Sequence, residues 1–138
     1  MAVSHALAVR QDFANVACTA TAPTFSAGAA QKIILYSGTP PTNASTALSG
    51  NTAISTITAI GFGAPSGAAV CTVSGSTADP SAVGGNATFY RRVKADGTTV
   101  IDQGLVATSA AELTVTSTTI AAGAVVTLNA GGTYSAAA

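Results

Sequence analysis

The chain has 138 residues, and its five acidic and five basic side chains cancel to a net charge of zero. Arg91, Arg92 and Lys94 form the one cluster of basic residues, so no face is expected to bind nucleic acid. The chain has no run of about 18 apolar residues, so no membrane-spanning helix is expected either. The single histidine, His5, lies at the start of the chain, so the groups that acid–base catalysis and metal binding need are scarce. We therefore expect no enzyme activity, no metal and no cofactor, and instead a structural or interaction protein.

The apolar content predicts one domain with a thin core. Alanine accounts for 31 of the residues counted as hydrophobic, which leaves 6 Leu, 7 Ile, 12 Val and 4 Phe as the larger core side chains. A chain of this length buries about 65–70% of its unfolded surface. Such a protein gains stability from neighbours that bind only its folded form. Because no export signal is evident after Met1, Cys18 and Cys71 are predicted to be reduced, with a disulfide between them as the alternative.

Residues 1–31 are predicted to form an N-terminal arm that precedes the main domain. Apolar side chains recur at helical spacing between Ala6 and Ala20, which indicates a single apolar stripe. Two interpretations stay open: a short helix that covers one end of a sheet, or an arm that docks on a partner. In the second case Arg10 and Phe13 are candidate interface residues.

From residue 32 to residue 138 the pattern is typical of an all-β domain. Short runs rich in Val, Ile and Thr alternate with turns rich in Gly, Pro, Asn and Ser, which favours a jelly-roll-like β-sandwich. The predicted strands are Lys32–Tyr36, Ala53–Ile60, Ala69–Ser74, Ala87–Lys94, Thr98–Gln103 with a possible extension through Leu105–Thr108, Glu112–Thr116, Ala124–Asn129 and a short one near Thr133.

The dipeptide Asp96-Gly97 lies between two of these strands and predicts a hairpin closed by a two-residue turn. This turn sets a register in which the cross-strand pairs are Ala95 with Thr98, Val93 with Val100, Arg91 with Asp102, and Phe89 with Gly104. One face then carries a valine pair, an ion pair and an aromatic ring over a glycine. Such pairs each contribute roughly 0.2–1 kcal/mol.

This register assigns different roles to neighbouring side chains of the hairpin. Arg91 and Asp102 form a structural ion pair beside the core. Tyr90, Arg92 and Lys94 point to the opposite face, which is the candidate interface with another subunit; an ordinary solvated face is the alternative.

Other motifs have simpler interpretations. The glycine-rich stretches at Gly61–Gly63 and Gly84-Gly85 lack the Lys-Ser/Thr of a phosphate-binding loop and are interpreted as turns. A serine nucleophile such as Ser109 would need a histidine base, and His5 is poorly placed for that task. The sequence therefore shows no motif for a catalytic or ligand-binding pocket.

Three spaced segments resemble a group of small virion proteins of tailed bacteriophages. The first is KIILYSGTPP at Lys32–Pro41, similar to that group's opening strand followed by Tyr-Ser-Gly-Thr-x-Pro. The second resembles that group's central hairpin; it consists of ATFYRRV at Ala87–Val93, followed by Asp96-Gly97 and Gln103-Gly104. The third resembles the group's ending, which is a strand, Ile-x-x-Gly and a further strand; it consists of ELTV at Glu112–Val115 and IAAG at Ile120–Gly123.

This resemblance, which covers about residues 32–129, implies a head cement or decoration protein with no catalytic residue. It implies binding to the major capsid protein on the outer surface of the virion, with self-association as a homodimer or homotrimer. The charge and apolar pattern described above predict no nucleic-acid or membrane partner. Two alternatives remain. One is a tail, neck or receptor-binding virion component, and the other is an exported pilus-like subunit, which would need an oxidised bridge between Cys18 and Cys71.

Overall fold

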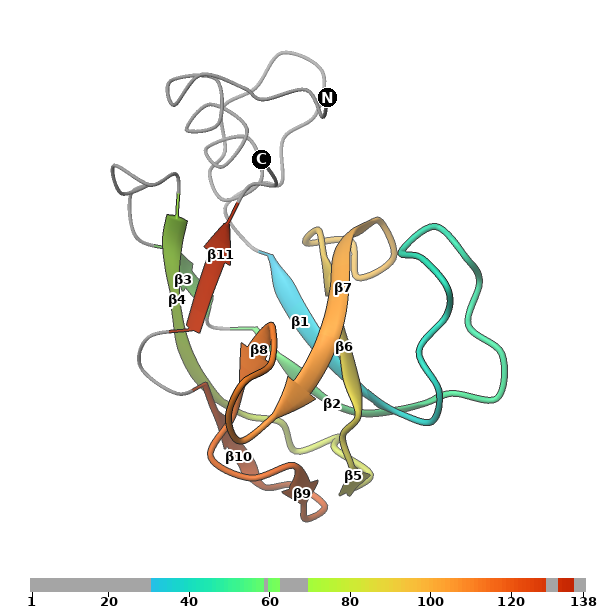
Figure 1. Cartoon of the computed structure of the whole chain (residues 1–138). Helices are drawn as coiled ribbons and strands as arrows, with labels where there is room; N and C mark the ends of the chain where they lie inside the picture. Colours follow the sequence, from blue (N-terminus) through green and yellow to red (C-terminus); the bar gives the residue numbers. More distant parts are fainter. Residues whose placement is uncertain (1–30, 59, 63–69, 129–131, 136–138) are drawn as a thin grey trace, which may run out of the picture.

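The computed structural model describes residues 31–58, 60–62, 70–128 and 132–135 (Figure 1). Within these ranges the chain is all β, with eleven short strands and no helix, so the predicted class is confirmed for this part. The predicted arm at 1–31 lies outside it except for Gln31, and so do Arg10, Phe13 and Cys18. The strands are β1 (Lys32–Ser37), β2 (Thr52–Ile57), β3 (Ile60–Phe62), β4 (Val70–Ala78), β5 (Gly85–Asn86), β6 (Phe89–Val93), β7 (Val100–Ala107), β8 (Leu113–Thr114), β9 (Thr119–Ile120), β10 (Val125–Thr127) and β11 (Gly132–Ser135).

The strands pair into one larger sheet and two smaller ones (Figure 1). The larger sheet has the order β2-β1-β6-β7-β8 and is antiparallel except for the parallel pair β7–β8. In the second sheet β4 pairs with β10, β11 and β3, and β5 pairs with β9 in a two-stranded ribbon. The predicted strand Ala53–Ile60 is divided into β2 and β3, which belong to different sheets. β5 and β9 were not predicted, because two-residue strands carry too short a pattern.

The core lies against one face of the larger sheet. Ile33 and Leu35 of β1 point to this face, as does Tyr90 of β6, and side chains after β7 complete it. Leu113, Val115, Ile120, Val126 and Leu128 belong to the same buried cluster. The C-terminal part of the chain therefore contributes much of the apolar surface that closes the core over β1 and β6.

The opposite face of the larger sheet is also covered. Tyr36 and Phe89 stack there with ring centroids 5.1 Å apart and an interplanar angle of 16°, and Phe89 is 0% exposed. All five residues of β6 are buried for this reason, although their sequence does not alternate between apolar and polar.

The predicted hairpin forms, but its turn and most of its register differ from the prediction. Lys94 N donates to Thr99 O, and Gly97 N donates to Lys94 O, so the loop is longer than two residues and Gly97 alone has a positive φ, of 77°. Val93 does lie opposite Val100 as predicted. A bulge follows that pair, so every later pair is displaced by one residue.

The displacement overturns the predicted partners along β6 and β7. Arg92, and not Arg91, lies opposite Asp102. Phe89 lies opposite Leu105, and the aromatic ring over Gly104 belongs to Tyr90. A Cβ added at Gly104 would lie 2.9 Å from Tyr90 Cε1, so a glycine is needed there.

The outer edge of β2 is capped by a neighbouring turn. Thr56 N donates to Asp79 Oδ2 at 2.7 Å, and Val83 N donates to Ile54 O at 3.1 Å. Asp79 Oδ1 accepts a further bond from Ser81 N, which fixes the turn itself. A strand edge that is occupied in this way is protected from pairing with another chain.

Ser55 is a buried polar residue on the core side of β2. It is 2% exposed, and its hydroxyl makes no hydrogen bond with the residues that the structure describes. Because a buried unsatisfied hydroxyl is costly, we expect Ser55→Ala to raise the free energy of unfolding by up to about 1 kcal/mol. Urea denaturation measures this change.

The matched control is Thr88→Val, which removes a hydroxyl that donates to Gly38 O at 2.6 Å. The free energy of unfolding of this variant is expected to be about 1 kcal/mol lower than that of the wild type. A Ser55→Ala protein that is less stable than the wild type would show that the hydroxyl has a stabilising role.

Candidate functional site

A long surface loop at residues 38–51 joins β1 to β2 at the right of Figure 1 and is held by several side chains. Its two ends are held together by Asn51. The Asn51 side-chain amide donates to Ser37 O at 3.3 Å and to Thr39 O at 2.9 Å, and its Oδ1 accepts a bond from Ser49 N. Thr88, just before β6, donates its hydroxyl to Gly38 O.

Two side chains from the larger sheet fasten the middle of this loop. Arg91 Nη2 donates to Thr46 O at 2.5 Å, and Gln103 Nε2 donates to Pro41 O at 2.7 Å. Arg91 Nε also donates to Gln103 Oε1, so the two anchors are bonded to each other. Since Arg91 and Gln103 are cross-strand partners, the loop is tied to β6 and β7 together.

Arg91 is the more shielded of the two anchors, and Gln103 is half-buried. Arg91 is buried, and its charge is close to the phenol of Tyr36. Burial raises the pKa of the Tyr36 hydroxyl, and the positive charge of Arg91 partly opposes that shift. Arg91 therefore anchors the loop and does not pair with Asp102 as predicted.

The ion pair lies on the core face of the sheet, between Arg92 Nη2 and Asp102 Oδ2. The side chain of Arg92 is 3% exposed and that of Asp102 is 22% exposed. Burial raises the pKa of Asp102, and the adjacent Arg92 charge opposes the shift without cancelling it. The predicted pair of Arg91 with Asp102 is thus wrong, because the partner of Asp102 is Arg92.

The face predicted to contact another subunit is not a surface of the folded chain. Tyr90 and Arg92 are buried inside the monomer, because both faces of β6 are covered. Lys94, beyond the end of β6, is half-buried. The remaining candidate interface residues, Arg10 and Phe13, lie outside the described part of the chain.

Each of the four carboxylates in the described part of the chain accepts a hydrogen bond from the chain itself. Asp79 caps the edge of β2, and Asp102 pairs with Arg92. Glu112 Oε2 accepts a bond from Leu105 N at 2.9 Å, on the edge of β7, and Asp96 accepts bonds from the hairpin turn. Three of these acids thus bond to turns or strand edges and the fourth to a buried arginine, and no group of three metal-ligating side chains is found among the described residues.

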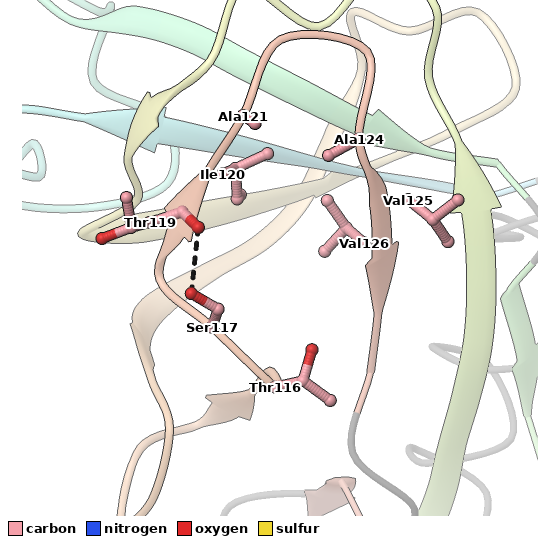
Figure 2. Close-up of a pocket in the computed structure, with 8 residues that line it drawn as sticks. All are labelled: Thr116, Ser117, Thr119, Ile120, Ala121, Ala124, Val125 and Val126. Carbon is pink, nitrogen blue, oxygen red and sulfur yellow. Dashed lines mark hydrogen bonds between the residues drawn. The ribbon is translucent and has the colours of Figure 1, made fainter.

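A groove of about 220 Å³ lies between two diverging segments of the described chain (Figure 2). The segments are joined at their base, where Val115 pairs with Leu128 and Thr116 N donates to Thr127 O. They then separate, because β9 pairs with β5 while β10 pairs with β4. The lining residues are Thr116, Ser117, Thr119, Ile120, Ala121, Ala124, Val125 and Val126.

This groove offers hydroxyl groups and small aliphatic side chains. Figure 2 shows Ile120 and Val126 pointing into the space between the two segments, and Ser117 donating its hydroxyl to Thr119 O at 2.9 Å. None of its lining residues is charged. The groove therefore has the chemistry of a packing surface, without a candidate nucleophile–base pair among its lining residues.

No protein-family model, curated protein or solved structure matches this chain. Among the residues that the structure describes, no helix is long and apolar enough to span a bilayer.

Proposed function

We propose that this chain is a structural virion protein that binds the outer surface of a tailed-phage head as a cement or decoration protein. Its partners are then the major capsid protein and further copies of itself. In this proposal the two larger sheets form a jelly-roll-like sandwich that carries the loop at residues 38–51 as a binding surface. The core and the charged side chains hold this surface in one shape.

The observation that carries the proposal is that the first two segments behind the resemblance are hydrogen-bonded to each other in the fold, and the third packs against the second. Pro41 of the first segment accepts a bond from Gln103 of the second, and Gly38 accepts one from Thr88. Glu112 of the third segment packs against Gly104, where a Cβ would lie 2.9 Å from Glu112 Cβ. The first two segments, far apart in sequence, thus hold the loop at residues 38–51 together, and the third packs against the second.

The loop has properties that suit binding to a protein shell. The stretch from Ile33 to Ala78 contains no charged residue, so little charge is desolvated when this surface is covered. Leu48, within the loop, is 37% exposed. Because the loop is already anchored, less conformational entropy is lost on binding. Many such modest contacts, repeated over a particle, give strong retention.

The proposal is tested by co-sedimentation with virions of the phage that encodes the chain, depleted of this protein and then supplied with purified variants. Wild-type protein is expected to bind in a copy number comparable to that of the shell protein. Leu48→Arg, which places a charge on the loop, is expected to lower occupancy at a given protein concentration. The matched control is Val83→Arg, an equally drastic change at an exposed valine on the β2-capping turn.

Three results would contradict the proposal. Binding at about a dozen copies or fewer would favour a tail or neck component, and no binding would remove the virion role. Equal losses from the two arginine variants would show that the loop is not the contact surface. Removing residues 1–16 tests the N-terminal arm separately: if the arm docks on the shell, particle binding is lost while the circular dichroism spectrum of the β domain is unchanged.

A further inference from the structure

The tip of the β6–β7 hairpin contains an Asp-Gly bond, Asp96-Gly97, in a well-defined geometry. This dipeptide is chemically reactive in flexible chains, because the backbone nitrogen of the glycine can attack Cγ of the aspartic acid. Glycine offers no Cβ to shield that nitrogen. The new N–C bond closes a succinimide ring and expels the carboxyl oxygen as water. Addition of water to either ring carbonyl then yields aspartate or isoaspartate, so the overall change is an isomerisation that needs no oxidant or enzyme.

The folded hairpin restrains the electrophile of this reaction. Asp96 Oδ1 accepts bonds from Thr98 N and Thr99 N, each at 2.8 Å, and Asp96 Oδ2 accepts one from Thr99 Oγ1 at 2.5 Å. These bonds hold both oxygens against residues beyond Gly97. They also favour the ionised carboxylate, whose oxygen is a far poorer leaving group than that of the protonated acid.

The nucleophile is restrained as well. Gly97 N donates to Lys94 O at 2.9 Å, and Lys94 N donates to Thr99 O, which closes the loop. Gly97 adopts a φ of 77°, a conformation that glycine accepts without strain. Ring closure requires this nitrogen to leave its acceptor and reach Cγ of Asp96, which would open the turn.

We propose that Asp96-Gly97 is a site of spontaneous isoaspartate formation that the folded hairpin keeps closed, with Thr99 as the controlling residue. Thr99 supplies two of the three bonds to the carboxylate, from its hydroxyl and its backbone N–H. Isoaspartate formation at this bond then records how often the hairpin opens. This inference does not depend on the proposed virion role.

The experiment compares isoaspartate at this bond in folded and urea-unfolded wild-type protein during prolonged incubation at neutral pH. Peptide mapping by mass spectrometry, with isoaspartyl methyltransferase labelling, locates and quantifies the product. Folded wild-type protein is expected to accumulate it at least about tenfold more slowly than unfolded protein, because each hydrogen bond to the charged carboxylate favours the closed state. Thr99→Val keeps the side-chain shape and removes the hydroxyl; in the folded state it is expected to react several times faster than wild type.

The matched control is Thr116→Val, an exposed threonine outside the hairpin, which is expected to react at the wild-type rate. Equal rates in folded and unfolded wild-type protein would overturn the proposal. A folded Thr99→Val protein that reacts no faster than wild type would remove the role of Thr99. If Thr99→Val does not fold, the comparison of the two wild-type states still decides whether the hairpin protects this bond.

Discussion

Asp102→Ala is expected to lower the free energy of unfolding by about 3–5 kcal/mol, the largest effect of any single charge removal in the described part of the chain. The carboxylate is the partner of the Arg92 guanidinium, which is almost completely buried on the core face of the larger sheet. Its removal leaves a positive charge in an apolar environment without this counter-charge. Urea denaturation, with the slope of the transition compared between variants, measures the loss.

A double variant separates the worth of the ion pair from the cost of an isolated charge. Replacing the pair together, with Arg92→Met and Asp102→Leu, is expected to recover most of the stability lost in Asp102→Ala, because well-packed apolar side chains often match a buried ion pair. A double variant as unstable as the single one would show that the pair contributes a specific interaction which packing does not replace.

The two aspartates of the hairpin are expected to affect stability in opposite directions as the pH changes. Burial raises the pKa of the Asp102 carboxyl in the folded protein above its ordinary value of 3.8. The folded protein therefore binds a proton at Asp102 at a higher pH than the unfolded chain does. As the pH rises from 3.8 through the raised pKa, the contribution of Asp102 to the free energy of unfolding falls. The Thr99 hydroxyl, with the backbone N–H groups of Thr98 and Thr99, holds the pKa of Asp96 well below its ordinary range. Its contribution is therefore present above pH 3.8 and is lost as the pH falls further.

Gly84→Ala is expected to destabilise the protein by about 3 kcal/mol or more, through two costs that add. Gly84 has a φ of 78°, which costs an alanine about 1–2 kcal/mol. An added Cβ would also lie 2.8 Å from Ala122 N and 3.0 Å from Ile120 O. Because both atoms belong to the backbone, relief requires the β5–β9 ribbon to shift.

Gly123→Ala is the matched control for this prediction. Gly123 has a φ of 70°, but an added Cβ would meet no atom within 4 Å. It should therefore show the cost of backbone conformation alone, about 1–2 kcal/mol. Thermal and urea unfolding of the two variants measure the difference; equal losses would show that the contact between Gly84 and the segment after β9 is readily relieved.

The all-β class and the positions of most strands could be predicted from short Val-, Ile- and Thr-rich runs bounded by turn residues. The hairpin at Asp96-Gly97 could be located for the same reason. The roles of its side chains could not, because one extra residue in β7 moves every later residue to a new partner. No local pattern in the β7 sequence marks that bulge, and so the ion pair was assigned to Arg91 instead of Arg92.

The loop at residues 38–51 was harder to predict than the sheet. The prolines at Pro40 and Pro41 indicate a stiff, extended segment, but nothing in them identifies Gln103 as its anchor. A contact between a side chain and a distant carbonyl oxygen leaves no periodic pattern in the sequence, and Gln103 and Pro41 are 62 residues apart. The face predicted to contact a partner is the one that carries Tyr90 and Arg92, and it is covered by the core. Predicting this would have required knowing on which side of β6 the C-terminal segments pack.

The anchoring of the loop at residues 38–51 has a consequence for how this region can change. The side chains that reach it from β6, from β7 and from Thr88 just before β6 bond to carbonyl oxygens, those of Gly38, Pro41 and Thr46. Every residue type carries such an oxygen, so substitutions at exposed loop positions such as Thr42 and Leu48 leave the supporting bonds in place. The region is thus a natural place for sequence diversification, or for grafting a foreign peptide epitope, on an unchanged scaffold.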